Sequence, residues 1–276
     1  MISAHGKFIA CALFAFAPLV FLHAGEKTEG VAAEKSPWSG SLSTGWDSLY
    51  MFRGVNQLPG YRNYGSSISW TALSLTWSPT ENDSFTAASW AAFGLSDSDY
   101  KEIDATMVYE RTIGNFSLSA GYALYTVLSE PGGLYSNELT VSAAYEFSIG
   151  AVTITPAANY DFTLGPQPGN GGYIEEGLGY LELRLDSEIP LYRDFLKATP
   201  WVAAGFSFGY NSVETSADQT QSFTGTDHIE AGLALPIALS STLSLSPYVA
   251  FSHTWVQLVG THQDTFWGGV SVNFSF

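Results

Sequence analysis

The chain has 276 residues, and its 26 Asp and Glu residues outnumber its 10 Lys and Arg residues, which gives a formal net charge of −16. We expect no nucleic-acid partner, because phosphate binding needs clustered basic side chains. Only 13% of residues are charged and the mean hydropathy is +0.08, which is too polar for a bundle of membrane-spanning helices and suits a barrel whose alternate residues meet lipid.

The N-terminal segment predicts a secretory signal peptide. A basic start precedes an apolar run from Phe8 to Leu22, and the small residue Ala24 follows at the expected cleavage site. The run is shorter than the roughly 20 residues that a helical span needs. The only cysteine, Cys11, lies inside it, so we expect no disulfide in the mature chain. The predicted signal peptide, disordered periplasmic leader and transmembrane β-barrel cover residues 1–24, 25–37 and 38–276.

After the leader, about twelve segments alternate apolar and polar residues, as strands with two different faces do. Most run for about 10 to 13 residues, the length that a tilted strand needs to cross a bilayer, whereas a soluble sandwich prefers about 5 or 6. The second segment changes phase near Ala72, which predicts a β-bulge. In chain order the segments are 42–50, 66–77, 85–95, 103–112, 116–127, 138–149, 152–163, 176–188, 198–210, 228–239, 243–255 and 266–276.

Short and long connections alternate along the chain. The links 112–115, 150–151 and 240–241 are minimal, whereas the links on the other side are mostly longer and rich in Gly, Pro, Asn and Asp. Short periplasmic turns opposite long extracellular loops are typical of outer-membrane barrels. We therefore predict an all-β fold, a closed antiparallel transmembrane β-barrel of about 12 strands in an up-and-down meander, with both termini periplasmic. One link, 189–197, suggests a short helix.

The last strand predicts how the barrel is assembled. From Asp264 to Phe276 the alternation is strict and ends on an aromatic residue, which resembles the C-terminal assembly signal of bacterial outer-membrane barrels. We expect the barrel-assembly machinery, outer-membrane lipid and lipopolysaccharide as partners, and the bacterial outer membrane as the location. The predicted signal residues are Phe266, Val270, Val272, Phe274 and Phe276. Aromatic residues at segment ends predict interfacial girdles: Trp38, Tyr50, Phe52, Trp77, Tyr160, Phe162, Tyr210 and Trp255.

A family resemblance begins at Trp46-Asp-Ser-Leu-Tyr-Met-Phe-Arg-Gly-Val55. An aspartate and a tyrosine followed by Phe-Arg-Gly at the end of the first strand resembles the porins of the TorF-like family. Further short matches are Glu102-Ile-Asp104, Gly121-Tyr122 to Tyr125, and Glu138 after Pro131-Gly132. The resemblance covers the first half of the mature chain and fades after Glu146. It implies a porin-like outer-membrane channel and names no solute.

Charged residues on the non-lipid phase of the strands are the candidate pore lining. A charge on the lipid face costs up to about 2–4 kcal/mol at the bilayer midplane, so these side chains belong in a water-filled interior. Rings of Asp and Glu favour cations. The alternative is a salt-bridge network that fills a closed interior, with Arg53–Asp47 and Arg184–Glu182 as pairs. The candidates are Asp47, Arg53, Glu102, Asp104, Glu138, Glu146, Asp161, Glu182, Arg184 and Glu230.

The histidines give little support to catalysis or metal binding. His253 shares the lipid phase with Val249 and Phe251, and no serine stands beside it on that face of its own strand. We interpret it as a residue of the aromatic belt rather than the base of an outer-membrane lipase. His228 and Glu230 face inward and could form a hydrogen-bonded pair without metal-ligand spacing. We expect no enzyme, metal or cofactor.

An outer-membrane lipase or acyl-transfer enzyme is the third hypothesis and would need Ser, His and an acid in one phase; two hypotheses from other classes stand ahead of it. The first is a passive outer-membrane channel for small hydrophilic solutes, neutral or cationic, because about twelve strands enclose a lumen between those of filled and open barrels. The alternative is a non-conducting structural or adhesive barrel that acts through its extracellular loops. The sequence leaves open the solute, the oligomeric state and whether a loop folds into the lumen.

Overall fold

The structure is a computed structural model that describes residues 36–56, 67–95, 100–128, 134–164, 179–193, 195–216, 219–255 and 264–276. The predicted signal peptide and most of the predicted leader lie outside these residues. Within the described ranges, no helix is long and apolar enough to cross a membrane.

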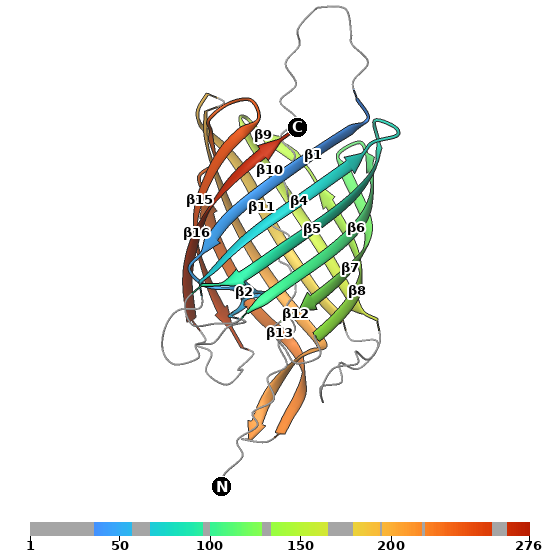
Figure 1. Cartoon of the computed structure of the whole chain (residues 1–276), viewed down its shortest axis with the longest axis vertical. Helices are drawn as coiled ribbons and strands as arrows, with labels where there is room; N and C mark the ends of the chain where they lie inside the picture. The colour runs from blue at the N-terminus through green and yellow to red at the C-terminus, as the bar shows by residue number, and fades with distance from the viewer. Residues whose placement is uncertain are drawn as a thin grey trace, which may run out of the picture.

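Twelve antiparallel strands form one closed barrel, which confirms the predicted fold class (Figure 1). Each strand pairs with the next along the chain, and the last pairs back onto the first. The strands are β1 (Trp38–Asp47), β4 (Ile68–Trp77), β5 (Asp83–Gly94), β6 (Lys101–Ile113), β7 (Phe116–Val127), β8 (Leu134–Tyr145), β10 (Val152–Thr163), β11 (Gly179–Tyr192), β12 (Leu196–Ser216), β13 (Gln219–Ala234), β15 (Leu243–Thr254) and β16 (Asp264–Ser275). Two short pieces, β9 (Phe147–Ile149) and β14 (Ile237–Ala238), continue β8 and β13 toward the short turns.

The barrel closes along a seam between β1 and β16. The register runs from Ser41 opposite Ser275 to Asp47 opposite Gly269. Beyond it, the Gly40 amide donates to the Phe276 carbonyl at 2.8 Å and the Phe276 amide donates back at 3.0 Å. The barrel therefore begins and ends at the same end, as Figure 1 shows, and an even number of strands requires this.

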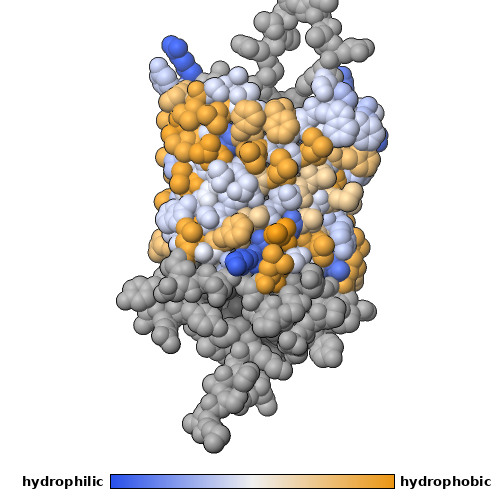
Figure 2. Space-filling view, viewed as in Figure 1, coloured by the Kyte–Doolittle hydropathy of each residue, from blue (hydrophilic) through white to orange (hydrophobic). Residues whose placement is uncertain are grey.

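The outer wall is apolar, as the alternation predicts. Figure 2 shows large apolar side chains spread over the visible face of the barrel, and Met107, Val141 and Phe266 are 69%, 54% and 78% exposed. On β16 the predicted assembly residues Phe266, Val272 and Phe274 lie on this face, and Phe276, directly after the strand, is also exposed. The other phase turns inward, where small polar side chains such as Ser41 and Ser74 are buried and paired. The exposed apolar side chains therefore face lipid, and the polar side chains face the interior of the barrel.

The structure corrects two local predictions. No bulge occurs at Ala72, because the register of β4 with β1 is continuous from Trp77 to Ile68. The apparent phase change arises because Ile68 and Trp70 turn inward and pack near Tyr50 in the barrel interior. The link 189–197 is no helix, since β11 continues to Tyr192 and β12 begins at Leu196 after a tight turn.

A short hairpin, separate from the barrel sheet, follows β1 in the chain. Strands β2 (Met51–Phe52) and β3 (Val55–Asn56) pair with each other, and Arg53 and Gly54 form the two-residue turn with φ of 46° and 71°. Positive φ at both central residues is typical of the tightest β-hairpins. Residues 50–56 are called the inserted hairpin below. Phe52 is only 2% exposed, so the hairpin lies inside the wall.

This hairpin overturns part of the predicted aromatic girdle. Tyr50, Phe52 and Tyr210 are buried inside the barrel. By contrast, Trp38, Trp77, Phe162 and Trp255 are exposed on the outside, where interfacial aromatics belong.

Candidate functional site

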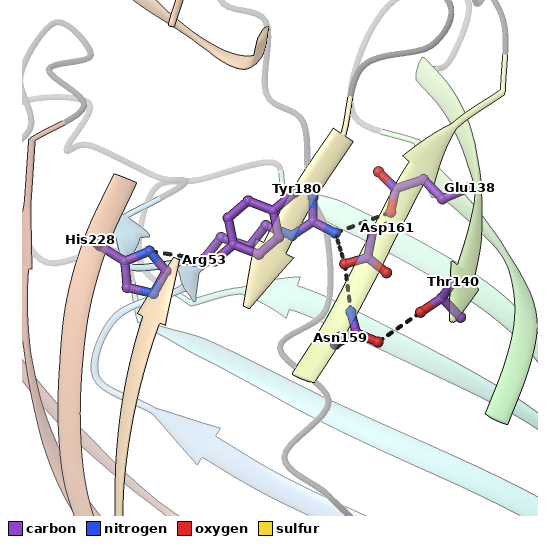
Figure 3. A network of polar contacts seen from close by, with 7 residues as sticks. All are labelled: Arg53, Glu138, Thr140, Asn159, Asp161, Tyr180 and His228. Atoms are coloured by element: carbon purple, nitrogen blue, oxygen red, sulfur yellow. Dashed lines mark hydrogen bonds and ion pairs between the residues drawn. The ribbon is translucent and has the colours of Figure 1, made fainter. Parts of the chain in front are cut away.

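The centre of the candidate site is the side chain of Arg53, which the inserted hairpin carries across to β8 and β10. Its Nη2 atom donates to Asp161 Oδ2 at 2.6 Å and to Glu138 Oε2 at 3.1 Å (Figure 3). Arg53 and Glu138 are 4% and 1% exposed. Two carboxylates therefore hold one buried guanidinium, a charge-assisted arrangement that gives both position and strength.

Aromatic rings complete the surroundings of this guanidinium. Arg53 Cζ lies 4.1 Å from the centroid of the Tyr180 ring and 4.2 Å from that of Tyr210. Tyr210 turns inward because β12 changes register after Phe208, where Gly209 has a φ of 80°. These contacts are cation–π interactions in a desolvated place, where they are strongest. We call Arg53, Glu138, Asp161, Tyr180 and Tyr210 the arginine cage.

Further polar contacts extend the cage along the wall. Asn159 Nδ2 donates to Asp161 Oδ2 at 2.8 Å, and Thr140 Oγ1 donates to Asn159 Oδ1 at 2.8 Å (Figure 3). Ser252 Oγ donates to the Gly54 carbonyl at 3.0 Å. The turn of the hairpin is thus bound to β15 as well as to β8 and β10.

His228 lies against the same turn, and its polar contacts are with Asp227 and Tyr180 rather than with Glu230. Its ring stacks on Tyr180 at an interplanar angle of 9°, and its Nδ1 atom lies 3.4 Å from Asp227 Oδ1. An added Cβ on Gly54 would come within 2.1 Å of the His228 ring. The hairpin therefore fits this position only with glycine at 54.

The start of the hairpin is bound to a different part of the wall. Tyr50 donates its hydroxyl to Glu102 Oε2 at 2.8 Å, Tyr100 donates to the same carboxylate, and Tyr50 stacks on Trp90 with ring centroids 5.8 Å apart. Asp104, two residues along β6, accepts the Thr126 amide at 3.1 Å. Glu102 and Asp104 are therefore buried beneath the hairpin and do not line open water.

The remaining inward charges lie toward the middle of the barrel and are half-buried. Arg184 binds Asp186, with its Nε atom 3.0 and 2.9 Å from the two carboxylate oxygens, so the predicted Arg184–Glu182 pair is wrong. Asp47 accepts the Tyr248 hydroxyl at 2.8 Å while Arg53 is held elsewhere, so the predicted Arg53–Asp47 pair is also wrong. Arg184 takes Asp186, which is as close in sequence as Glu182, whereas the partners of Arg53 and Asp47 are far away in sequence and are brought to them by the closed barrel.

Two predicted residues lie apart from this interior. Glu146 is exposed at the short-turn end, between β8 and β9, where the ladder to Pro156 is interrupted. His253 lies on the outer face, with Nδ1 2.7 Å from Asp264 Oδ1 and its ring edge-on to Trp255. Among the described residues, no cluster of three or more His, Cys, Asp or Glu side chains could hold a metal ion.

Sequence reasoning missed the aromatic partners of the charges. Tyr180, Tyr210, Trp201 and Tyr248 all lie in the interior, beside charged side chains. One signal was available, because bulky aromatic residues on the polar phase of a strand need something inside the barrel to pack against.

The comparisons with known proteins support the fold. No protein-family model matches the chain, and no curated protein matches its sequence. Among solved structures, the COG4313 outer membrane channel from Pseudomonas putida F1 superposes with a TM-score of 0.55 at 9% identity, covering 91% of this chain and 100% of the other. LpxR from Salmonella typhimurium gives 0.53 at 8% identity, with 85% and 99% covered. The KdgM porin gives 0.50 at 10% identity, with 86% and 99% covered.

These likenesses establish that the chain has the fold of outer-membrane barrels, which include porins and channels. At such low identity they assign no solute. The resemblance to the TorF-like family stays a prediction.

Proposed function

We propose that the protein is an outer-membrane channel for the passive diffusion of small hydrophilic solutes, neutral or cationic, and that the inserted hairpin sets the narrowest part of the path. We further propose that the chain reaches the bacterial outer membrane through its signal peptide and the barrel-assembly machinery. We expect the inward-facing charged side chains described above to line this path.

The observation that carries this proposal is the charge of the interior. Half-buried carboxylates on the inner face include Asp47, Glu182 and Glu230, while the basic groups Arg53 and Arg184 are already bound to carboxylates. A carboxylate beside a narrow wall of low dielectric constant attracts counterions strongly. We therefore expect cations to pass more readily than anions of the same size.

The hairpin supports a restricted path rather than a wide one. It contacts β6 through Tyr50 and reaches β8, β10 and β15 through Arg53 and Gly54. A segment bound to strands on separate parts of the wall narrows the interior at the long-connection end. Small solutes and ions are the class that such a path admits.

Single-channel recording in planar bilayers tests the proposal. We expect discrete conductance steps and a cation-selective reversal potential in a potassium chloride gradient. The preference should weaken as the salt concentration rises, because the screening length falls from about 10 Å at 0.1 M to about 3 Å at 1 M. An anion-selective reversal potential would contradict the proposal.

The alternative is a non-conducting structural or adhesive barrel, and one observation favours it. The inserted hairpin is held by buried charges and rings, as a permanent filling would be. Complete absence of conductance, in a refolded sample whose barrel content is verified by circular dichroism, would support this alternative.

A further inference from the structure

Two aromatic rings lie side by side in the interior, away from the arginine cage. Trp201 on β12 and Tyr248 on β15 flank strand β13, and their ring centroids are 6.3 Å apart with an interplanar angle of 52°. Both side chains point inward and are half-buried. No part of the proposed channel mechanism above uses them.

Two glycines on neighbouring strands leave room for these rings next to the wall. A Cβ added to Gly232 would lie 2.0 Å from the Trp201 ring, and one added to Gly269 would lie 2.1 Å from Asp47 Oδ1 and 2.6 Å from Tyr248 Cε1. Each ring therefore occupies the space that a side chain of the neighbouring strand would fill.

Carboxylates hold both rings by their polar edges. Trp201 Nε1 donates to Glu230 Oε1 at 2.8 Å, and the Tyr248 hydroxyl donates to Asp47 Oδ1 at 2.8 Å. Both donors are neutral, so these bonds orient the carboxylates without cancelling their charge. Electron-rich ring faces and negative charge thus occur together.

A cation already lies near one of these rings. Arg184 Cζ is 5.4 Å from the centroid of the Trp201 ring, within the range of cation–π attraction. Arg184 itself is neutralised by its two-bond contact with Asp186. The negative charge of Asp47 and Glu230 remains available to a cation from outside.

We propose that Trp201, Tyr248, Asp47 and Glu230 form a binding site for small organic ammonium ions on the path through the barrel. Aromatic faces beside carboxylates recognise alkylated ammonium groups, which shed water easily. A metal ion would require more oxygen ligands, and an anion would be repelled. The proposal rests on the proposed function only in requiring that solutes reach the lumen.

The test uses the full chain, refolded in detergent micelles, and follows the binding of choline by tryptophan fluorescence. The neutral probe 3,3-dimethylbutan-1-ol has the same shape as choline without its charge. We expect choline to bind in about the millimolar range and the alcohol to bind at least about five-fold more weakly, because the alcohol lacks the positive charge on which both cation–π attraction and attraction to the carboxylates depend. Equal binding of both probes, or binding of neither, would overturn the proposal.

Two variants locate the site. Glu230→Gln keeps an oxygen that accepts the Trp201 indole hydrogen and removes only the charge, and we expect choline affinity to fall about five-fold. Trp201→Leu removes the ring and should reduce it further. Trp77→Leu, on the outer face, is the matched control and should bind choline as the wild type does.

The outcomes separate this proposal from the channel itself. If Trp201→Leu does not refold, Glu230→Gln decides, and unchanged choline affinity in that variant overturns the site. Conductance in potassium chloride without choline binding would support the channel and overturn the proposed ammonium site. Choline binding without conductance would support the ammonium site and contradict the channel, so the site would belong to a non-conducting barrel.

Discussion

The two halves of the barrel interior are lined by different kinds of side chain. Near the long connections, the inserted hairpin is surrounded by aromatic rings and buried charges, with Arg53 at the centre. Near the short turns, the wall carries small hydroxyl side chains that bind one another across neighbouring strands. These pairs are Ser41–Ser74 at 2.8 Å, Thr76–Thr86 at 2.9 Å and Ser119–Ser142 at 2.5 Å.

The two kinds of contact have different effects on the barrel. The hydroxyl pairs join adjacent strands, so they stabilise the wall and leave space within it. The contacts of the hairpin join strands on separate parts of the wall, so they fill that space. We therefore expect changes in the filled half to alter conductance, and changes in the other half to alter assembly or to have little effect.

Replacement of Arg53 should have the largest effect. Arg53→Ala leaves Glu138 and Asp161 buried without their cation, which costs about 3–5 kcal/mol when one partner of a buried pair is removed. The hydrogen-bonded wall persists, so the loss falls on the placement of the hairpin. We expect a several-fold rise in single-channel conductance.

The matched control is Arg111→Ala. Arg111 pairs with Asp83 at 3.1 Å, but its side chain is 54% exposed, and such surface pairs contribute little. Its conductance should equal that of the wild type. Unchanged conductance in Arg53→Ala would show that the hairpin does not restrict the path.

Gly54→Ala should displace the inserted hairpin by steric overlap rather than by loss of a charge. The new Cβ would meet the His228 ring at 2.1 Å, and the positive φ of 71° also disfavours alanine. All charges stay in place, so a conductance rise here would arise from shape alone. Gly114→Ala, where φ is 61° and nothing lies within 4 Å of the added Cβ, controls for backbone strain.

Removal of Phe276 tests the opposite end of the barrel. Its backbone forms both hydrogen bonds with Gly40 that extend the β1–β16 seam. We expect less protein in the outer membrane and normal export to the periplasm, measured by cell fractionation. A truncated chain that reaches the outer membrane in normal amounts would leave Phe276 without an assembly role.

Arg184→Gln should raise cation preference by a smaller amount. The change removes one positive charge from the interior and leaves Asp186 uncompensated. The reversal potential in a salt gradient should shift toward that of an ideal cation channel at 0.1 M salt and return toward the wild-type value at 1 M. A shift in the anion direction would show that Arg184 does not act through its charge.

Glu146→Gln should have the smallest effect. Glu146 is exposed at the short-turn end, where water screens its charge from the narrow part of the path. We expect a slight loss of cation preference, measured by the same reversal potential. A loss larger than that of Glu230→Gln would place the selective region at the short turns instead.

The strands could be predicted because lipid imposes a simple rule on each of them. Leu139, Val141 and Tyr145 alternate with Glu138 on β8, and the structure places the first three outside and Glu138 inside. The strand count and the closed meander follow from the same rule repeated along the chain. No long-range information is needed for this part.

The interior could not be predicted in the same way. Arg53 lies close to Asp47 in sequence, yet it binds Glu138 and Asp161, which the curvature of the wall brings to it. Trp70 and Ile68 suggested a bulge because an internal segment to pack against was not foreseen. Contacts across a lumen depend on the closed shape, and the alternation of a single strand does not encode that shape.

The position of the inserted hairpin in the chain has a consequence for the order of folding. The hairpin follows the first strand, yet Arg53 contacts residues 85 and 108 positions further along, and Gly54 accepts from Ser252, 198 positions away. Contacts of such high sequence separation form late, after the entropy of closing long loops has been overcome. The guanidinium therefore stays hydrated until β8, β10, β11 and β12 surround it, and its dehydration belongs to a late stage of barrel formation.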